Sequence, residues 1–260
     1  MINANGFLPG ARLPTVLRAA RSEDGSCRHL LVWKAGPGWR MVSSAVLGGG
    51  LGEREWVLNA QVRPGYGRMD PDRHLAELAA AEGLRGPGVG LMTAAEVDDC
   101  TWAEDGGAVA LVTTGIGVPV WAAAPGPAAA EVPGPYVPGT INVLAVVPAP
   151  VADAGLVNLL ATVTEAKVQA LLDAGYACSG TPSDAVCVAV RTPRPQEAAD
   201  PFGGPRSRWG ARLARAVHRA VLEGAELDRD RRDRGPAPLH TGPGPDCRRT
   251  DVLSRGRVPA

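Results

Sequence analysis

The sequence has few aromatic residues and no excess of charge of either sign. Aromatic residues make up only 4% of the 260 residues, while hydrophobic residues reach 45%. Alanine, valine and leucine must therefore fill most of a core, and a chain of this length is large enough to bury one. Lysine and arginine (27) balance aspartate and glutamate (27), so the formal net charge is zero. No bulk attraction to nucleic acid or to an anionic membrane is expected.

Signals for membrane insertion, secretion and cross-linking are also missing. No apolar run reaches the roughly 20 residues of a membrane-spanning helix. The first residues, MINANGFLPGARLP, lack the basic start and apolar stretch of a secretory signal. The cysteines are odd in number and none belongs to a C-x-x-C pair, so neither a disulfide framework nor a zinc knuckle is indicated. A reducing, cytoplasmic setting is the expectation.

Familiar catalytic and metal-binding signatures do not occur either. The sequence contains no G-x-S-x-G and no H-E-x-x-H motif. Ligand spacings such as H-x-x-x-H are missing, so no metal is expected. His74 is the only histidine in a stretch that carries a motif, and its helical setting beside Arg73 favours a position at the surface.

Hydrophobic patterns predict a mixture of strands and helices. Strands are expected at Arg28–Ala35, Arg40–Leu47, Glu53–Val62, Gly88–Ala94, Gly106–Gly117, Thr140–Val147 and Asp184–Val190. The first three lie close together in sequence, which favours an antiparallel meander. Helices are expected from Asp70 to Gly83, from Asp153 to Gly175 and from Ser207 to Gly224, each ended by a glycine. The predicted fold class is α+β, with helices packed on a mixed, largely antiparallel β-sheet in a single domain.

Composition divides the chain into three parts. Residues 1–26 are irregular in pattern, and residues 27–224 carry the regular elements of one domain. Residues 225–260 are rich in charge, proline and glycine, and they are predicted to form a disordered tail.

Three consecutive glycines, Gly48–Gly50, are the strongest local signal. A phosphate-binding loop needs G-x-x-x-x-G-K-[ST] or G-x-G-x-x-G leading into a helix. Here Glu53 and a strand pattern follow the glycines, and no lysine is present. One interpretation is a glycine-rich hairpin or bulge. The other is that bare backbone at Gly49 and Gly50 approaches a bulky ligand.

The stretch SSAVLGGGLGEREWVLNAQV (Ser43–Val62) resembles the signature of the adenosylcobinamide amidohydrolase family. Five further runs continue the resemblance in family order: GVGLMTAAEV (Gly88–Val97), PGTIN (Pro138–Asn142), TEAKVQALLDAGY (Thr164–Tyr176), GTPSDAVCVA (Gly180–Ala189) and FGGPRSRWG (Phe202–Gly210). Six runs in order are specific, and they span nearly all of the predicted domain. The sequence departs from the family's usual G-T-x-T-D-A at Ser183, where the hydroxyl is kept.

The resemblance implies an enzyme of cobamide salvage. Members of the family cleave the amide between the corrin ring side chain and the aminopropanol of adenosylcobinamide, giving adenosylcobyric acid and 1-amino-2-propanol. The corrinoid is then a small-molecule substrate, no cofactor is expected, and neither nucleic acid nor a membrane is a partner. A homo-oligomer is left open. The alternative from another class is a non-catalytic corrinoid-binding protein. A kinase or nucleotidyltransferase is disfavoured by the missing phosphate-loop lysine.

Polar residues inside the matching runs are the candidates for substrate binding. Ser43 and Ser44 alternate along a strand, so one faces the site and the other the opposite side. Backbone bonding and packing are the simpler role for such serines. Asn59 and Asn142 interrupt apolar strands, and their amides pair either with protein groups or with the carboxamides of a corrin ring. Thr181 stands just before a strand, beside the end of the long helix.

Three ionisable residues are the candidates for catalysis. Glu165 lies on a polar face of the long helix, which is usually a solvated face. The resemblance instead favours Glu165 as a partly desolvated general acid or base. Lys167 points elsewhere on the helix, either to pair with a carboxylate or to reach the substrate. Asp184 either orients a base or a water, or makes the side-chain bond of an Asx turn. Self-cleavage before Thr140 would expose an N-terminal nucleophile, but nothing in the sequence requires it.

Overall fold

The structure is a computed structural model, and it describes residues 14–23, 25–125, 139–234 and 250–252. Its strands are β1 (Val16–Glu23), β2 (Ser26–Lys34), β3 (Trp39–Ser43), β4 (Gly50–Glu53), β5 (Trp56–Gln61), β6 (Gly88–Thr93), β7 (Thr101–Asp105), β8 (Ala108–Thr114), β9 (Ile141–Val147), β10 (Ala185–Arg191) and β11 (Thr250–Asp251). Its helices are α1 (Pro71–Ala81), α2 (Asp153–Asp173) and α3 (Arg208–Arg234), and a 3₁₀ turn, η1, covers Val97–Asp99.

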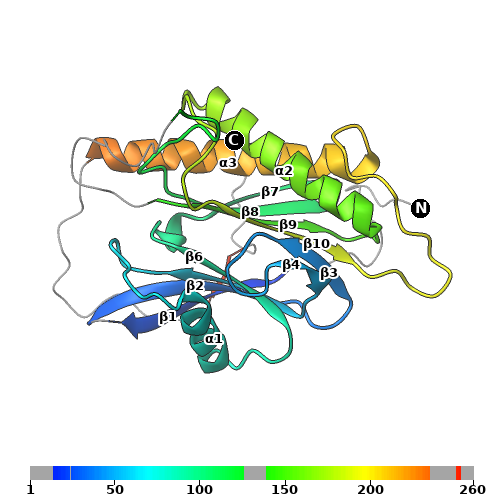
Figure 1. The fold of residues 1–260 in the computed structure, drawn as a ribbon, viewed down its shortest axis with the longest axis horizontal. Coiled ribbons are helices and arrows are strands. Elements are labelled where there is room, and N and C mark those ends of the chain that lie inside the picture. The colour runs from blue at the N-terminus through cyan, green and yellow to red at the C-terminus, as the bar shows by residue number, and fades with distance from the viewer. Residues whose placement is uncertain (1–13, 24, 126–138, 235–249, 253–260) are drawn as a thin grey trace.

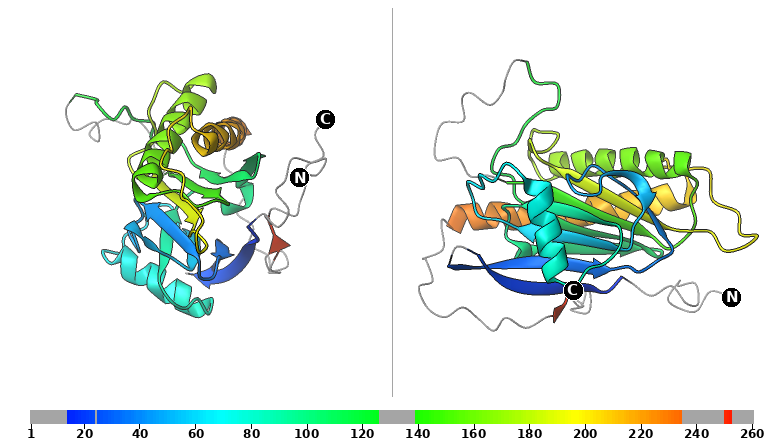
Figure 2. Two further views of the ribbon diagram at one scale, coloured as in Figure 1. Left: turned by 90° about the vertical axis from the view of Figure 1, so that its right-hand side faces the viewer. Right: turned by 60° about the horizontal axis from the view of Figure 1, so that its bottom comes forward.

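The strands form two sheets that stack face to face between layers of helix (Figure 1). One sheet has the strand order β11-β1-β2-β5-β6, and the other has the order β4-β3-β10-β9-β8-β7. Helices α2 and α3 lie side by side over the six-stranded sheet, while α1 lies on the far side of the five-stranded sheet (Figure 2). Among the strands that the structure describes, β5–β6 and β9–β10 pair in parallel and the other neighbours are antiparallel. The predicted α+β class with a largely antiparallel arrangement is confirmed.

Strand β9 shows how the sequence builds these layers. Ile141, Val143 and Ala145 are fully buried and belong to the cluster that packs beneath α2 and α3. Leu144 and Val146, at the alternate positions, belong to the cluster between the two sheets. Because successive side chains of a strand point to opposite faces, a strand covered on both faces must be apolar throughout. The run INVLAVV meets that requirement at every position except its asparagine.

The predicted early meander is wrong in its partners. Strand β2 pairs with β5 in the five-stranded sheet, but β3 belongs to the other sheet and pairs with β10. Met41 and Val42 of β3 are both buried, one toward each face. Burying apolar side chains on both faces stabilises a strand, so β3 is more stable inside the doubly covered sheet than beside its neighbour in sequence.

The predicted domain boundaries, 27–224, need correction at both ends. Strand β1 lies inside the segment that was expected to be irregular, and it pairs with β2 along its whole length. Helix α3 runs ten residues past Gly224, into the predicted tail, to Arg234. Gly224 is buried, and a Cβ atom there would overlap the hydroxyl of Thr114 on β8. This glycine therefore allows a close helix–sheet contact and does not end the helix.

The remaining parts of the predicted tail, 235–249 and 253–260, lie outside the described residues. Residues 1–13 of the predicted N-terminal segment also lie outside them. No helix in the described part of the chain is long and apolar enough to cross a bilayer.

Candidate active site

A cavity of about 450 Å³ opens at the end of the two sheets where four buried strands meet. Strands β5 and β6 end at this cavity, whereas β9 and β10 begin there. The five-stranded sheet and the loop after β5 contribute Val62, Arg63, Gly65, Tyr66 and residues 90–94. The six-stranded sheet contributes residues 44–46, Thr140 and residues 183–185. The cavity therefore has one wall from each sheet.

A buried ion pair stands behind the second wall. Lys167 reaches from α2 to Asp184, and the two side chains are only 7% and 9% exposed. Asp184 also accepts bonds from the backbone N–H of Thr181 (3.1 Å), from the hydroxyl of Thr181 (2.5 Å) and from the N–H of Ile141 (3.0 Å). A carboxylate offers about four acceptor positions, and these four donors fill them. Asp184 thus fixes the starts of β9 and β10. Of the two roles left open for Lys167, the structure shows the pairing with a carboxylate.

Gly180 leaves room for this pair. Its φ of 150° lies in a region that favours glycine, and a Cβ atom would overlap the carboxylate of Asp184 and crowd the ammonium of Lys167. Glycine is therefore required at position 180, because any side chain there would displace the buried ion pair.

The two neighbouring serines separate as the alternation predicted. Ser43 is buried, donates to the carbonyl of Val186 (2.9 Å) and accepts from the N–H of Ala45 (3.1 Å). Ser44 is exposed, lines the cavity, and accepts from the N–H of Val186 (3.1 Å). Ser44 is consequently the serine that a ligand in the cavity would meet, while Ser43 secures the junction of β3 with β10.

A second pair of hydroxyls in the cavity was not predicted as a site. The hydroxyls of Thr140 and Ser183 lie 2.6 Å apart, and both residues line the cavity. Thr140 is buried and precedes β9, whereas Ser183 is exposed and precedes β10. Both residues lie in the runs that matched the family. Each comes just before a strand, and the starts of two neighbouring parallel strands lie side by side, so this pattern could have predicted that the two hydroxyls are close.

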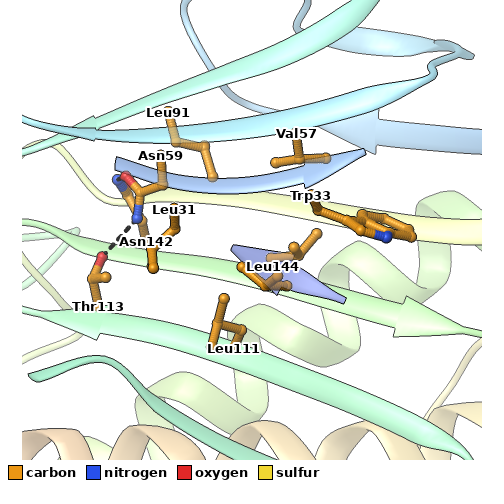
Figure 3. A pocket seen from close by; sticks show the side chains of 10 residues that line it. Leu31, Trp33, Val57, Asn59, Leu91, Leu111, Thr113, Asn142 and Leu144 are labelled. Carbon is orange, nitrogen blue, oxygen red and sulfur yellow. Dashed lines mark hydrogen bonds between the residues drawn. The ribbon is translucent and has the colours of Figure 1, made fainter. Parts of the chain in front are cut away.

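Asn59 and Asn142 meet between the sheets, away from the main cavity (Figure 3). The amide of Asn142 donates to Asn59 (2.9 Å) and to the carbonyl of Met92 (2.9 Å). The amide of Asn59 donates to the hydroxyl of Thr113 (3.0 Å). These side chains line a separate space of about 20 Å³. Of the two roles left open by the sequence, these contacts support pairing with protein groups for both amide nitrogens, whereas the side-chain oxygen of Asn142 is buried with no partner among the described residues.

Replacing Asn142 by alanine is expected to lower the free energy of unfolding by roughly 1–3 kcal/mol, because Asn59 and Met92 keep buried acceptors without a donor. Urea unfolding measures this loss. A double-mutant cycle with Asn59→Ala should show coupling of at least about 0.5 kcal/mol, since the two amides share one hydrogen bond. Strict additivity of the two losses would contradict the network.

The other predicted residues lie outside the cavity lining. Gly49, in the turn before β4, and Gly50, the first residue of β4, are exposed. The guanidinium of Arg54 donates to the carbonyl oxygens of Gly48 (3.0 Å) and Gly49 (3.4 Å). Glu165 is exposed on α2, so the partial desolvation expected for it is wrong. Its catalytic role and the binding roles of the two glycines remain predictions without a contact in the structure.

His74 is buried, contrary to the expected surface position. Its Nδ1 lies 2.9 Å from the hydroxyl of Tyr66, and its Nε2 lies 3.4 Å from a carboxylate oxygen of Glu23. The two rings are nearly parallel, at 9°, with centroids 5.6 Å apart. Burial lowers the pKa of His74 and raises the pKa of Tyr66, so both groups favour their neutral forms. No apolar period spans this junction of loop and helix, so sequence reasoning missed the contact.

Within the described residues, no group of three histidine, cysteine, aspartate or glutamate side chains is placed to hold a metal ion.

A model of the family described as adenosylcobinamide amidohydrolase matches residues 13–233, which is most of the chain. The chain belongs to the adenosylcobinamide amidohydrolase family. The match begins before β1 and ends within the last turn of α3, in agreement with the corrected domain boundaries.

A curated relative supports the same assignment. The adenosylcobinamide amidohydrolase of Methanosarcina mazei is 30% identical over 190 residues, covering 71% of this chain and 89% of the relative. Among solved structures, the PH0078 protein from Pyrococcus horikoshii OT3 is similar to this chain with a TM-score of 0.43 and 12% identity, covering 82% of this chain and 85% of that one.

Proposed function

We propose that this protein hydrolyses the amide between the corrin ring side chain and the aminopropanol of adenosylcobinamide. The products would be adenosylcobyric acid and 1-amino-2-propanol, and the corrinoid would be substrate and not cofactor. Membership of the family carries this proposal, since the match covers residues 13–233.

The cavity suits one arm of a corrinoid. Ligand sites typically enclose roughly 300–1,000 Å³ and combine an apolar lining with a few polar groups, and the cavity of about 450 Å³ lies in that range. Val46, Val62 and Met92 supply apolar surface, while Ser44 and Thr140 supply hydroxyls. Val46 is 56% exposed, so apolar surface continues to the mouth of the cavity, where the edge of the ring would rest.

Amide hydrolysis needs an activated water or nucleophile, donors for the oxyanion and a proton for the leaving amine. The hydroxyls of Ser44, Thr140 and Ser183 are the donors that can face a carbonyl oxygen in this cavity. The buried pair of Lys167 and Asp184 holds the wall that presents two of these hydroxyls. In this proposal the two charged residues position the site, and Glu165 is the predicted acid or base that experiment must test.

The test is incubation of the purified protein with adenosylcobinamide, anaerobically and in dim light. Adenosylcobyric acid and free aminopropanol are followed by mass spectrometry, with Glu165→Gln in parallel. Both products in stoichiometric amounts are expected for the wild type. Loss of product in the variant would place Glu165 at the chemistry, whereas full activity would remove it from the mechanism. Wild-type protein that forms neither product would overturn the proposal.

One observation favours a second candidate, corrinoid binding without catalysis. The four acceptor positions of Asp184 are filled by protein donors, so this carboxylate is not free to act as a base. Co-elution of the corrinoid with the protein on gel filtration, without product, would support this candidate.

A further inference from the structure

We propose that Tyr66 is a catalytic residue of this amide hydrolysis and that His74 is its positioning partner, with the two groups relaying a proton out of the cavity and back into it. This inference rests on the proposed function, and it supplies the proton acceptor that the buried ion pair lacks.

The relay has a carboxylate, an imidazole and a phenol in series. Tyr66 lines the cavity from the loop after β5. Its hydroxyl lies 2.9 Å from Nδ1 of His74, which stands on the inner face of α1. Nε2 of the same ring lies 3.4 Å from Oε1 of Glu23, at the end of β1. Three separate segments therefore meet at one buried imidazole, and one of them, through Tyr66, also lines the cavity.

The direction of each hydrogen follows from the partners. A carboxylate only accepts, so the imidazole turns its N–H at Nε2 toward Glu23. In the neutral ring Nδ1 then carries a lone pair, and it accepts the hydrogen of the Tyr66 hydroxyl. The phenol oxygen keeps its own lone pairs free to accept a second hydrogen bond. In this proposal the oxygen takes a proton from a water in the cavity that Tyr66 lines, while its own proton passes to His74.

Charged groups of both signs face the imidazole. Glu23 and Glu77 raise the pKa of His74, whereas Arg21 and Arg68 lower it, and burial, the largest effect, lowers it further. The net effect is a pKa below the ordinary value of 6.5. His74 is consequently neutral at pH 7 and able to accept a proton, and acidification removes that ability.

The reaction balances with water as the only co-reactant. The water oxygen attacks the amide carbon, one water proton passes to the Tyr66 oxygen, and the Tyr66 proton passes to Nδ1 of His74. Glu23 stabilises the resulting imidazolium. The relay then reverses, Tyr66 delivers a proton to the amide nitrogen, and the C–N bond breaks. The acid and the amine leave, and both side chains return to their starting states.

The first experiment compares wild type with Tyr66→Phe, which removes only the hydroxyl. General acid–base catalysis typically contributes roughly 10²–10⁴-fold, so kcat/KM for adenosylcobinamide should fall by at least about 100-fold. Binding, measured from the corrinoid absorption on titration, should change by less than about threefold. Arg73→Gln is the matched control, since this side chain is exposed on the same helix and pairs with Glu77. The control should retain wild-type kcat/KM.

The second experiment separates a relay from a merely structural contact. The wild-type profile of kcat/KM should lose activity on its acid side, below a pH of about 6.5, as His74 becomes protonated. In His74→Gln the activity should be low and this acid limb should disappear. Glu23→Gln should move the limb to lower pH, because the carboxylate raises the pKa of His74. Thermal unfolding of each variant shows whether it is folded.

The outcomes keep the two proposals apart. Wild-type protein without product refutes the proposed function. If the wild type is active, two results overturn the relay and leave the proposed function intact. One is a kcat/KM of Tyr66→Phe within threefold of the wild-type value. The other is an unchanged acid limb in the pH profile of His74→Gln. If Tyr66→Phe fails to fold, the acid limb in Glu23→Gln decides, and a limb that does not move overturns the relay.

Discussion

Replacing Asp184 by asparagine is expected to lower the free energy of unfolding by roughly 3–5 kcal/mol, the usual cost of leaving one charge of a buried pair without its partner. The ammonium of Lys167 would stay buried beside an uncharged amide. The amide nitrogen would also face two groups, Lys167 and Thr181, that can only donate or already donate to this position. Urea unfolding followed by circular dichroism measures the loss.

The same substitution should reduce amide hydrolysis by roughly 100-fold or more, since displacement of about 1 Å at a reacting site costs that much. Asp184 accepts from the N–H of Ile141, the first residue of β9, and from the hydroxyl of Thr181, in the segment before β10. Thr140, just before β9, lines the cavity and would move with them. Release of aminopropanol, measured at saturating adenosylcobinamide, tests this effect in the variant fraction that remains folded.

Asp153→Asn is the matched control, on the helix that carries Lys167. Asp153 makes a two-point pair with Arg40, at 2.5 and 2.7 Å, but its side chain is 53% exposed. Surface pairs contribute about 0–1 kcal/mol, so this variant should unfold near the wild-type urea concentration. Equal losses for the two variants would show that burial gives the Lys167–Asp184 pair no special role.

The elements that were predicted well have strong and local signals. Helices α1 and α2 and strands β9 and β10 begin and end within about two residues of the predicted positions, because their apolar periods are complete. Strand partners could not be predicted in this way. The pairing of β3 with β10 joins Ser43 to Cys187, far apart in sequence, and is decided by burial on two faces and not by local pattern.

Two glycines that were both predicted to end a helix differ in the structure. Gly175 follows α2 with a positive φ of 80°, as a helix-ending glycine should. Gly224 looks the same in sequence, but it lies inside α3, where the helix crosses Thr114. Sequence alone does not distinguish a glycine chosen for its backbone angle from one chosen for its lack of a side chain.

The candidate site was predicted only where the family resemblance provided long-range information. Lys167, Thr181 and Asp184 are brought together as three members of one hydrogen-bonded cluster. Asn59 and Asn142 were placed on the correct strands but face the space between the sheets. Sequence patterns do not predict that these side chains face the space between the sheets. Either face of a strand that is buried on both sides can meet the cavity, and the stacking of the two sheets decides which one does.

Gly48→Ala is expected to lower the free energy of unfolding by roughly 2–5 kcal/mol, the sum of a left-handed backbone cost and an overpacking cost. Gly48 has a φ of 67°, and a Cβ atom there would overlap the carbonyl oxygen of Gly88 on β6. The neighbouring N–H of Gly90 donates to the carbonyl of Leu47 at 3.0 Å, which forms a bridge between the chain after β3 and the edge of the other sheet. The substitution would therefore separate the two sheets at this edge.

Gly50→Ala separates the two costs, because Gly50 has a φ of 81° but nothing within 4 Å of its Cβ position. Only the backbone cost of about 1–2 kcal/mol applies there. Urea midpoints of the two variants should differ accordingly, and only Gly48→Ala should also lose hydrolysis, since residues 44–46 and 90–94 line the cavity on either side of the bridge. Equal losses would mean that the glycines are needed for the turn alone. A larger loss at Gly48 would mean that the run of glycines sets the distance between the two walls of the cavity.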